Sequence, residues 1–178
     1  VAAAPRAEHV FIISIDGGKP AVIAESEAPT LKQIAAEGAV TWEASTIFPS
    51  ITLPSHTSML TGVGPEKHMI RWNAYTPIKG FVKVPTVFSV LHETDPKAVS
   101  GMFVGKMKFR HLWLKDSVSI FDFGGPQDRR PVAGSLEIEK DKKTALQVAN
   151  QAIPWLKEHK PRLAFIHFAD VDTAGHAF

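Results

Sequence analysis

Apolar and polar residues occur along the chain in blocks that predict strands and helices in turn. Residues 9–18, HVFIISIDGG, form a continuous apolar run closed by an aspartate and two glycines, which is typical of a parallel strand buried on both faces. Residues 162–172, RLAFIHFADVD, repeat this pattern and also end in acids. Two further strands are predicted at 39–46 and 98–105.

The spacing of apolar residues between these strands predicts helices. Residues 30–38 and 141–159 carry apolar side chains three and four positions apart, and Gly38 suits the end of the first helix. Residues 54–60 and 85–93 each begin with a proline, which favours the first turn of a helix. Strands and helices alternate without repeats or a low-complexity linker. We therefore predict one α/β domain with a largely parallel central sheet flanked by helices.

Composition narrows the possible functions only a little. The chain has 178 residues, of which 44% are apolar and 21% charged, as in an ordinary globular domain with a core. Its net charge of +2 is too small to indicate nucleic-acid-specific binding or a membrane surface, and no apolar run is long enough to predict a membrane span. The absence of cysteine excludes disulfides, thiolate metal ligands and cysteine nucleophiles.

The two ends of the chain carry further expectations. The chain begins VAAAPRAEH without an initiator methionine, which resembles the region after a signal-peptide cleavage site. An artificially trimmed chain begins in the same way, so both explanations stay open, and we expect a periplasmic or secreted protein. The last residues, DTAGHAF, stop within a polar, motif-like stretch. Because domains rarely end in such a stretch, we expect a fragment.

Acidic residues follow both long apolar runs. Asp16 closes the first run, and Asp170 and Asp172 close the last. Ligands of open α/β sheets bind beyond the carboxyl ends of the strands, so these carboxylates are candidates for one site. His176 adds an imidazole four residues after Asp172, in a stretch with Gly175 that we expect to be a loop able to fold both side chains onto one cation. Carboxylate and imidazole ligands together suit Zn²⁺ or a similar divalent cation. Each group taken alone is explained as simply by turn formation or helix capping.

Thr52 lies between two prolines in FPSITLPSHTSMLTG, residues 48–62. With Pro54 at the first position of the predicted helix, the free N–H groups and the positive end of the helix dipole point back toward Thr52. Such a helix start holds an oxyanion or a phosphate well. A threonine hydroxyl is a useful nucleophile only when a base or a metal lowers its pKa, which nearby metal-binding acids would do. The alternative is that Thr52 simply caps the helix.

Four separated motifs resemble the type I phosphodiesterase/nucleotide pyrophosphatase family of the alkaline phosphatase superfamily. These motifs are IISIDGG, FPSITLPSHTSMLTG, PEKHMIRWN and DVDTAGH, in the order and approximate spacing of the family. The resemblance covers residues 10–75 and 162–178, whereas residues 80–160 match only in their α/β pattern. It implies an alkaline-phosphatase-like fold.

The resemblance implies a role for each matching residue. Asp16 is similar to the first metal-ligating aspartate, and Thr52 to the nucleophile that also ligates metal. Asn73 resembles the asparagine that donates to a phosphoryl oxygen. Asp172 and His176 resemble the aspartate and histidine ligands of a second metal ion. The implied cofactors are two divalent metal ions, which we expect to be Zn²⁺.

The sequence departs from the family pattern at two places. Ser55 stands where the family more often has asparagine, a mild difference. The remaining ligands of the family, an Asp-His pair and a later histidine, would lie beyond Phe178. We therefore expect residues 1–178 to be a single alkaline-phosphatase-like catalytic domain, truncated at its C-terminus, that forms the N-terminal portion of the fold.

The resemblance implies a metal-dependent phosphoric ester hydrolase, of the phosphodiesterase/nucleotide pyrophosphatase type, that acts through a phosphothreonine intermediate. Its substrate would be a small-molecule phosphate ester or a nucleotide, and the sequence indicates no oligomeric state. A phosphomonoesterase or phosphonate hydrolase of the same superfamily is the nearest alternative, and a non-catalytic metal-binding domain is another. A sulfatase is disfavoured because those enzymes make their nucleophile from Cys or Ser. A Ser-His-Asp hydrolase is disfavoured because the chain has no G-x-S-x-G elbow.

A cluster of basic residues follows the predicted strand at 98–105. Lys106, Lys108 or Arg110 could reach a substrate phosphate from this position, although solvated surface side chains are the simpler interpretation. His56 lies on the predicted helix next to Thr52, where it is as well suited to packing or to supporting a ligand as to a direct role.

Overall fold

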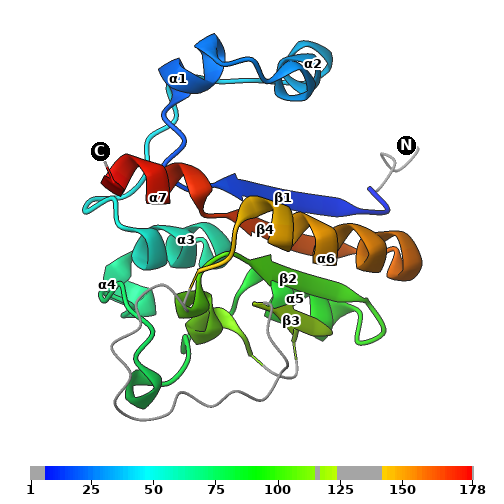
Figure 1. Cartoon of the computed structure of the whole chain (residues 1–178). Helices are drawn as coiled ribbons and strands as arrows, with labels where there is room; N and C mark the ends of the chain where they lie inside the picture. Colours follow the sequence, from blue (N-terminus) through cyan, green and yellow to red (C-terminus); the bar gives the residue numbers. More distant parts are fainter. Residues whose placement is uncertain (1–6, 115–116, 124–141, 178) are drawn as a thin grey trace, which may run out of the picture.

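A four-stranded, fully parallel sheet forms the centre of the protein, as the computed structural model shows for residues 7–114, 117–123 and 142–177 (Figure 1). The strand order is β1-β4-β2-β3. This order brings the two long apolar runs of the sequence side by side, because β1 pairs directly with β4. The strands are β1 Val10–Ile15, β2 Ser100–Val104, β3 Ile120–Asp122 and β4 Leu163–Phe168.

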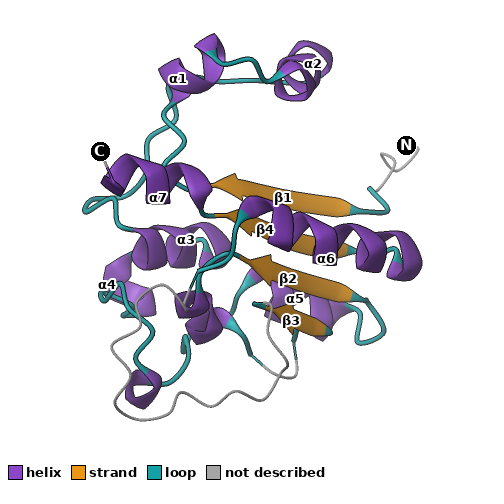
Figure 2. Cartoon of the chain, viewed as in Figure 1, coloured by secondary structure: helices purple, strands orange, loops and turns teal. Residues whose placement is uncertain are grey.

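Helices connect and cover these strands (Figure 2). Two of them begin at capping boxes that the sequence encodes, with Thr86 and Ser89 at α5 and Thr144 and Gln147 at α6. The α-helices are α1 Pro20–Glu25, α2 Pro29–Glu37, α3 Thr52–Thr61, α4 Pro65–His68, α5 Val87–Thr94, α6 Ala145–His159 and α7 Asp170–Ala177. Two 3₁₀ helices are η1 Pro77–Lys79 and η2 Met107–Leu112.

The sheet buries side chains on both faces of its middle strands. Successive side chains of a strand point to opposite faces, so neighbouring residues of β2 and β4 enter different clusters. Met102 and Phe165 join a large core with Leu53 of α3 and Phe88 of α5. A smaller core on the α6 side is formed by Phe103, Val148, Ala152 and Ile166. The α/β class and the parallel sheet predicted from the sequence are confirmed.

The edge strand β1 differs from the prediction that it is buried on both faces. Phe11 is 50% exposed and Ile13 is 57% exposed, while Ile12 packs against the large core. Helices α1 and α2, which follow β1, contain no buried residue and stand apart from the sheet (Figure 1). One face of β1 is therefore uncovered in the described part of the chain.

Several element boundaries also differ from the prediction. Residues 39–46 form no strand, and this mostly exposed segment pairs with none of the described strands. Helix α3 begins two residues before Pro54. The acidic segment after β4 is helical rather than a loop. The first residue of the helix predicted at 141–159 lies outside the described residues, and α6 begins at Ala145.

Candidate active site

Side chains from β1, β2, β4 and their following segments meet at the carboxyl edge of the sheet. The parallel register places Ile15 opposite Phe168, so Asp16 and the first turn of α7 leave the sheet next to each other. Figure 1 shows α7 beside the arrowhead of β1, with α3 close by. This is the edge at which open α/β sheets bind their ligands.

Thr52 is the first residue of α3, and its side chain does not cap the helix. Ile51 occupies the N-cap position, and α3 has no side-chain cap. The Thr52 hydroxyl instead donates to Asp16 Oδ2 at 3.1 Å. Because Thr52 is only 9% exposed, this contact fixes its hydroxyl against the carboxylate. The capping alternative is wrong, and the structure brings the predicted nucleophile to the predicted ligand.

Lys106 joins two of the predicted metal ligands. Its Nζ lies 2.5 Å from Asp16 Oδ2 and 2.5 Å from Asp172 Oδ2, and 3.4 Å from Thr52 Oγ1. The Lys106 side chain is 4% exposed. The interpretation of this residue as a solvated surface lysine is therefore wrong: it is buried at the centre of the site.

Asp16 is held in its ionised form. Burial alone raises the pKa of the Asp16 carboxyl, but hydrogen bonds from His167 and Lys106 and their charges hold the pKa well below its ordinary value. The carboxylate is thus ready to bind a cation at neutral pH.

Gly17 permits the close approach of α7 to β1. Its φ of +75° lies in the left-handed region, which favours glycine. A Cβ at this position would lie 2.7 Å from Asp172 Cα, closer than any real contact. The glycine after the strand-end aspartate therefore provides the space that Asp172 occupies.

Asn73 lies beside the start of α3. Its Oδ1 accepts from the Leu53 backbone N–H at 2.9 Å and from Lys108 Nζ at 3.1 Å. This orientation leaves the amide Nδ2–H group to donate to a ligand, and the residue is exposed.

The free N–H groups expected after Thr52 are taken up within the protein. Leu53 N–H donates to Asn73, Pro54 has no N–H, and Ser55 N–H donates to Ile51 at 3.1 Å. The helix start therefore does not offer an anion these three groups, contrary to the sequence-based expectation.

The two remaining candidates after β4 have different environments. His176 is one helical turn after Asp172, with Nε2 3.5 Å from Asp172 Oδ1, and its side chain is 79% exposed. Both carboxylate oxygens of Asp170 accept from the Ala145 backbone N–H at 3.0 Å. Asp170 thus fastens the start of α6 to the end of β4.

Two buried histidines support the site; the sequence left the role of His56 open and gave His167 no role. His56 donates from Nδ1 to the Thr52 carbonyl at 2.7 Å, so its Nε2 accepts from Ser14 Oγ at 2.7 Å. Burial lowers the pKa of His56 to about 4, which keeps it neutral. The ring therefore ties the start of α3 to β1.

His167 supports Asp16 from β4. Its Nδ1 accepts from the Gly105 N–H at 3.3 Å, so its Nε2–H faces Asp16 Oδ2, also at 3.3 Å. Burial lowers the pKa of His167. A histidine within the apolar run LAFIHF was the signal in the sequence, because a polar side chain in a buried strand needs a hydrogen-bond partner. In the structure His167 is fully buried.

The donor groups fit a divalent cation in one arrangement better than in another. Atoms of Asp16, His56 and His167 lie within 4.8 Å of one another, but both histidines use their ring nitrogens in the hydrogen bonds described above. Oxygen atoms of Asp16 and Asp172 instead converge on one point, which the Lys106 ammonium occupies. These two carboxylates, with the Thr52 hydroxyl beside Asp16 and the His176 imidazole beside Asp172, are a suitable ligand set for a divalent cation.

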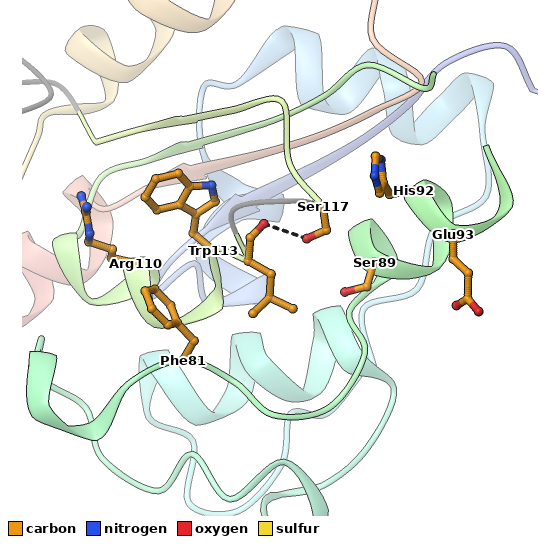
Figure 3. Close-up of a pocket in the computed structure, with 8 residues that line it drawn as sticks. Phe81, Ser89, His92, Glu93, Arg110, Trp113 and Ser117 are labelled. Atoms are coloured by element: carbon orange, nitrogen blue, oxygen red, sulfur yellow. Dashed lines mark hydrogen bonds between the residues drawn. The ribbon is translucent and has the colours of Figure 1, made fainter. Parts of the chain in front are cut away.

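A separate pocket of about 760 Å³ carries none of these groups (Figure 3). Its Ser117 hydroxyl donates to the Leu114 carbonyl at 2.9 Å, and Arg110 lies over the Trp113 ring. Arg110 therefore does not reach the candidate site. The pocket is lined by Phe81, Ser89, His92, Glu93, Arg110, Trp113, Leu114 and Ser117.

Comparison with known proteins identifies the family of this chain. The family model described as type I phosphodiesterase / nucleotide pyrophosphatase matches residues 10–178, so the chain belongs to this family. A curated relative from Schizosaccharomyces pombe, described as an uncharacterized pyrophosphatase/phosphodiesterase, is 25% identical over 95% of this chain. The chain spans 35% of the length of that relative.

Solved structures show the same fold. Phosphonoacetate hydrolase from Sinorhizobium meliloti 1021 in complex with phosphonoformate aligns with a TM-score of 0.61 and 22% identity, over 90% of this chain and 46% of that one. The complex of that enzyme with phosphonoacetate aligns with a TM-score of 0.60 and 20% identity, over 93% and 47%. The fold is alkaline-phosphatase-like, as expected. Among the described residues no helix is both long and apolar enough to cross a bilayer.

Replacing Gly17 with alanine tests whether its missing side chain sets the distance between the two carboxylates. We expect Gly17→Ala to reduce binding of Zn²⁺ by about tenfold or more, because Asp172 must move away from Asp16. Isothermal titration of metal-free protein measures this. Gly62→Ala is the matched control, since Gly62 has a φ of +69° but open space around it. Equal Zn²⁺ affinity in the two variants would contradict the role given to Gly17 in setting the distance between Asp16 and Asp172.

Proposed function

We propose that the protein is a metal-dependent phosphoric ester hydrolase of the phosphodiesterase/nucleotide pyrophosphatase type, with Thr52 as its nucleophile. The observation that carries this proposal is the buried contact between the Thr52 hydroxyl and Asp16, beside Asp172 and Lys106. Membership of the family supports the reaction class. A hydroxyl surrounded by charged side chains at the ligand-binding edge of a sheet is typical of a functional site.

The reaction would proceed in two displacements. Thr52 Oγ1 loses its proton and forms a bond to phosphorus as the bond to the leaving oxygen breaks, and the leaving oxygen takes up a proton. The intermediate is a phosphothreonine, which keeps the second ester group when the substrate is a diester. Water then attacks the same phosphorus, returns a proton to Thr52 Oγ1 and so releases Thr52. Two divalent ions, bound by Asp16 and Thr52 and by Asp172 and His176 with further ligands, would activate the nucleophile and stabilise the leaving oxygen. We expect these ions to be Zn²⁺.

Side chains rather than helix N–H groups would stabilise the charge on the transferred phosphoryl group. The Asn73 amide donates from Nδ2, because its Oδ1 already accepts from Leu53 and Lys108. Lys108 adds a positive charge next to it. Fixed donors of this kind stabilise a transition state because they are already oriented before the charge develops.

Hydrolysis of a phosphonate is a second candidate, favoured by two lysines in the site. Lys106 lies 3.4 Å from Thr52, and Lys108 lies 3.1 Å from Asn73. Two ammonium groups suit a small substrate with a second anion beside its phosphoryl group. The structural neighbour is named a phosphonoacetate hydrolase, and its ligand phosphonoacetate has this chemistry. Comparing kcat/KM for phosphonoacetate and for a nitrophenyl phosphodiester separates the two candidates.

We also propose that this chain is the N-terminal portion of a longer catalytic domain. It spans about half the length of the phosphonoacetate hydrolase, and no described residue covers the apolar face of β1 that carries Phe11 and Ile13. Amide hydrogen exchange of β1 should be slower by at least about tenfold in the longer protein than in residues 1–178 alone, if further chain packs on this face. Equal exchange rates would argue against the proposal. A periplasmic or secreted location stays a prediction from the sequence.

Replacement of Thr52 tests the proposed nucleophile. In the full-length protein Thr52→Ala should lower kcat by about 10³-fold or more while the fold remains intact. Thr61→Ala is the control, since Thr61 lies at the far end of the same helix and its hydroxyl donates to the Thr57 carbonyl. Mass spectrometry after rapid quenching should detect phosphate on Thr52. Normal turnover of Thr52→Ala would refute the mechanism, and metal binding without phosphothreonine would favour a non-catalytic metal-binding domain.

The charge of Lys108 predicts a pH dependence of substrate binding. Burial, together with the positive charge of Lys106, lowers the pKa of Lys108 to about 8. Lys108 is therefore positive below this pH and loses its charge above it. We expect KM for an anionic substrate to rise as pH increases through about 8. Lys108→Arg should keep KM low past this point, and Lys108→Met should raise it at every pH; an unchanged profile in Lys108→Met would contradict this role.

A further inference from the structure

The ammonium group of Lys106 occupies the place between the two carboxylates of the site. Its distances of 2.5 Å to Asp16 Oδ2 and 2.5 Å to Asp172 Oδ2 are those of two short, charge-assisted hydrogen bonds. The carboxylates come from β1 and from α7, and Lys106 follows β2. One positive charge thus holds together three segments that are distant in sequence.

Asp16 Oδ2 makes three close contacts in this arrangement. It accepts from Thr52 at 3.1 Å and from Lys106 at 2.5 Å, and it faces His167 Nε2 at 3.3 Å. A carboxylate oxygen offers about two lone-pair positions, so this oxygen has no free position for a metal ion. A metal ion that uses this oxygen must therefore replace one of its present partners.

Lys106 is the partner that a metal ion would replace. Thr52 reaches Asp16 through a hydroxyl that can also bind a metal, and His167 is fixed in β4 by its contact with Gly105. Lys106 carries a full positive charge, which repels a divalent cation at such short range. Its long side chain can also turn away while its backbone stays in place.

The buried ammonium group of Lys106 also explains how the two carboxylates can lie close together. The Asp16 and Asp172 side chains are only 10% and 19% exposed, and two carboxylates this close repel each other unless a cation lies between them. The Lys106 ammonium supplies that cation and leaves the ligands in position.

We propose that Lys106 is the internal counter-cation of the metal-free site and that metal binding displaces its ammonium group from Asp16 and Asp172. The proposal rests on the metal-dependent function proposed above. It goes beyond that function, because a metal site does not require a lysine that competes with the metal ion for its carboxylate ligands. In this exchange the metal ion takes the two carboxylate oxygens and Lys106 moves away with its proton. Lys106 therefore lowers the affinity of the site for metal and stabilises the protein without metal.

The test compares two buried lysines in the full-length, metal-stripped protein. Lys106→Met should bind Zn²⁺ at least about tenfold more tightly than the parent, as measured by competition with a chelating dye. Its melting temperature without metal should be lower. Lys143→Met is the matched control, because Lys143 is 8% exposed and pairs with Asp122 at 3.0 Å, outside the site. It should also melt earlier but bind Zn²⁺ as the parent does.

A second measurement needs no substitution. Amine-reactive labelling followed by peptide mass spectrometry should find Lys106 protected in the metal-free protein and labelled at least about threefold faster after Zn²⁺ is added, as its ammonium group leaves the carboxylates. Lys143 should show no such change. If Lys106→Met does not fold, this measurement alone tests whether metal binding displaces Lys106.

Equal or weaker Zn²⁺ binding by Lys106→Met would overturn the proposal, and so would labelling of Lys106 that ignores the metal. These results leave the proposed function intact as long as Thr52→Ala is inactive and the parent binds Zn²⁺. A parent protein that binds no Zn²⁺ would overturn both, and would be recognised before any variant is compared.

Discussion

The pairing of β1 with β4 is the constraint on which the rest of the site depends. Because these strands are parallel and in register up to Ile15 and Phe168, the residues that follow them leave the sheet at one edge. Asp16 is the next residue of one strand, and Asp172 lies in the first turn of the helix after the other. Gly17 then removes the side chain that would keep them apart. A site for a cation follows from strand register and one glycine.

Charge balance is the second constraint. The carboxylates of Asp16 and Asp172 need a cation between them, and Lys106 provides one from the segment that follows β2. Burial lowers the pKa of His56 and of His167, and each of these rings has defined hydrogen-bond partners. The two rings therefore orient Thr52 and Asp16. The buried cation between the two carboxylates is the Lys106 ammonium group.

The sequence predicted the parts of the site that lie directly at strand ends, and missed those that depend on tertiary contacts. Asp16 and Asp172 follow apolar runs, so their position was evident from the pattern alone. Lys106 also follows a strand, yet a lysine is usually exposed, and nothing local shows that two carboxylates surround it. The helical form of residues 170–177 was missed for a similar reason: the glycine in DVDTAGH favours a loop, but the helix continues through it.

The edge position of β1 explains why the fold was predicted better than its burial. An apolar run of six residues indicates a strand with two covered faces, and β4 fulfils this because it lies between β1 and β2. β1 is similarly apolar but has only one neighbour among the described strands, and Phe11 and Ile13 are about half exposed. His176, the predicted ligand with the most exposed side chain, lies in the last turn of α7, the helix that follows β4. Burial in the described part of the chain therefore decreases from the middle of the sheet outward, both along the strands toward β1 and along the predicted ligands toward His176.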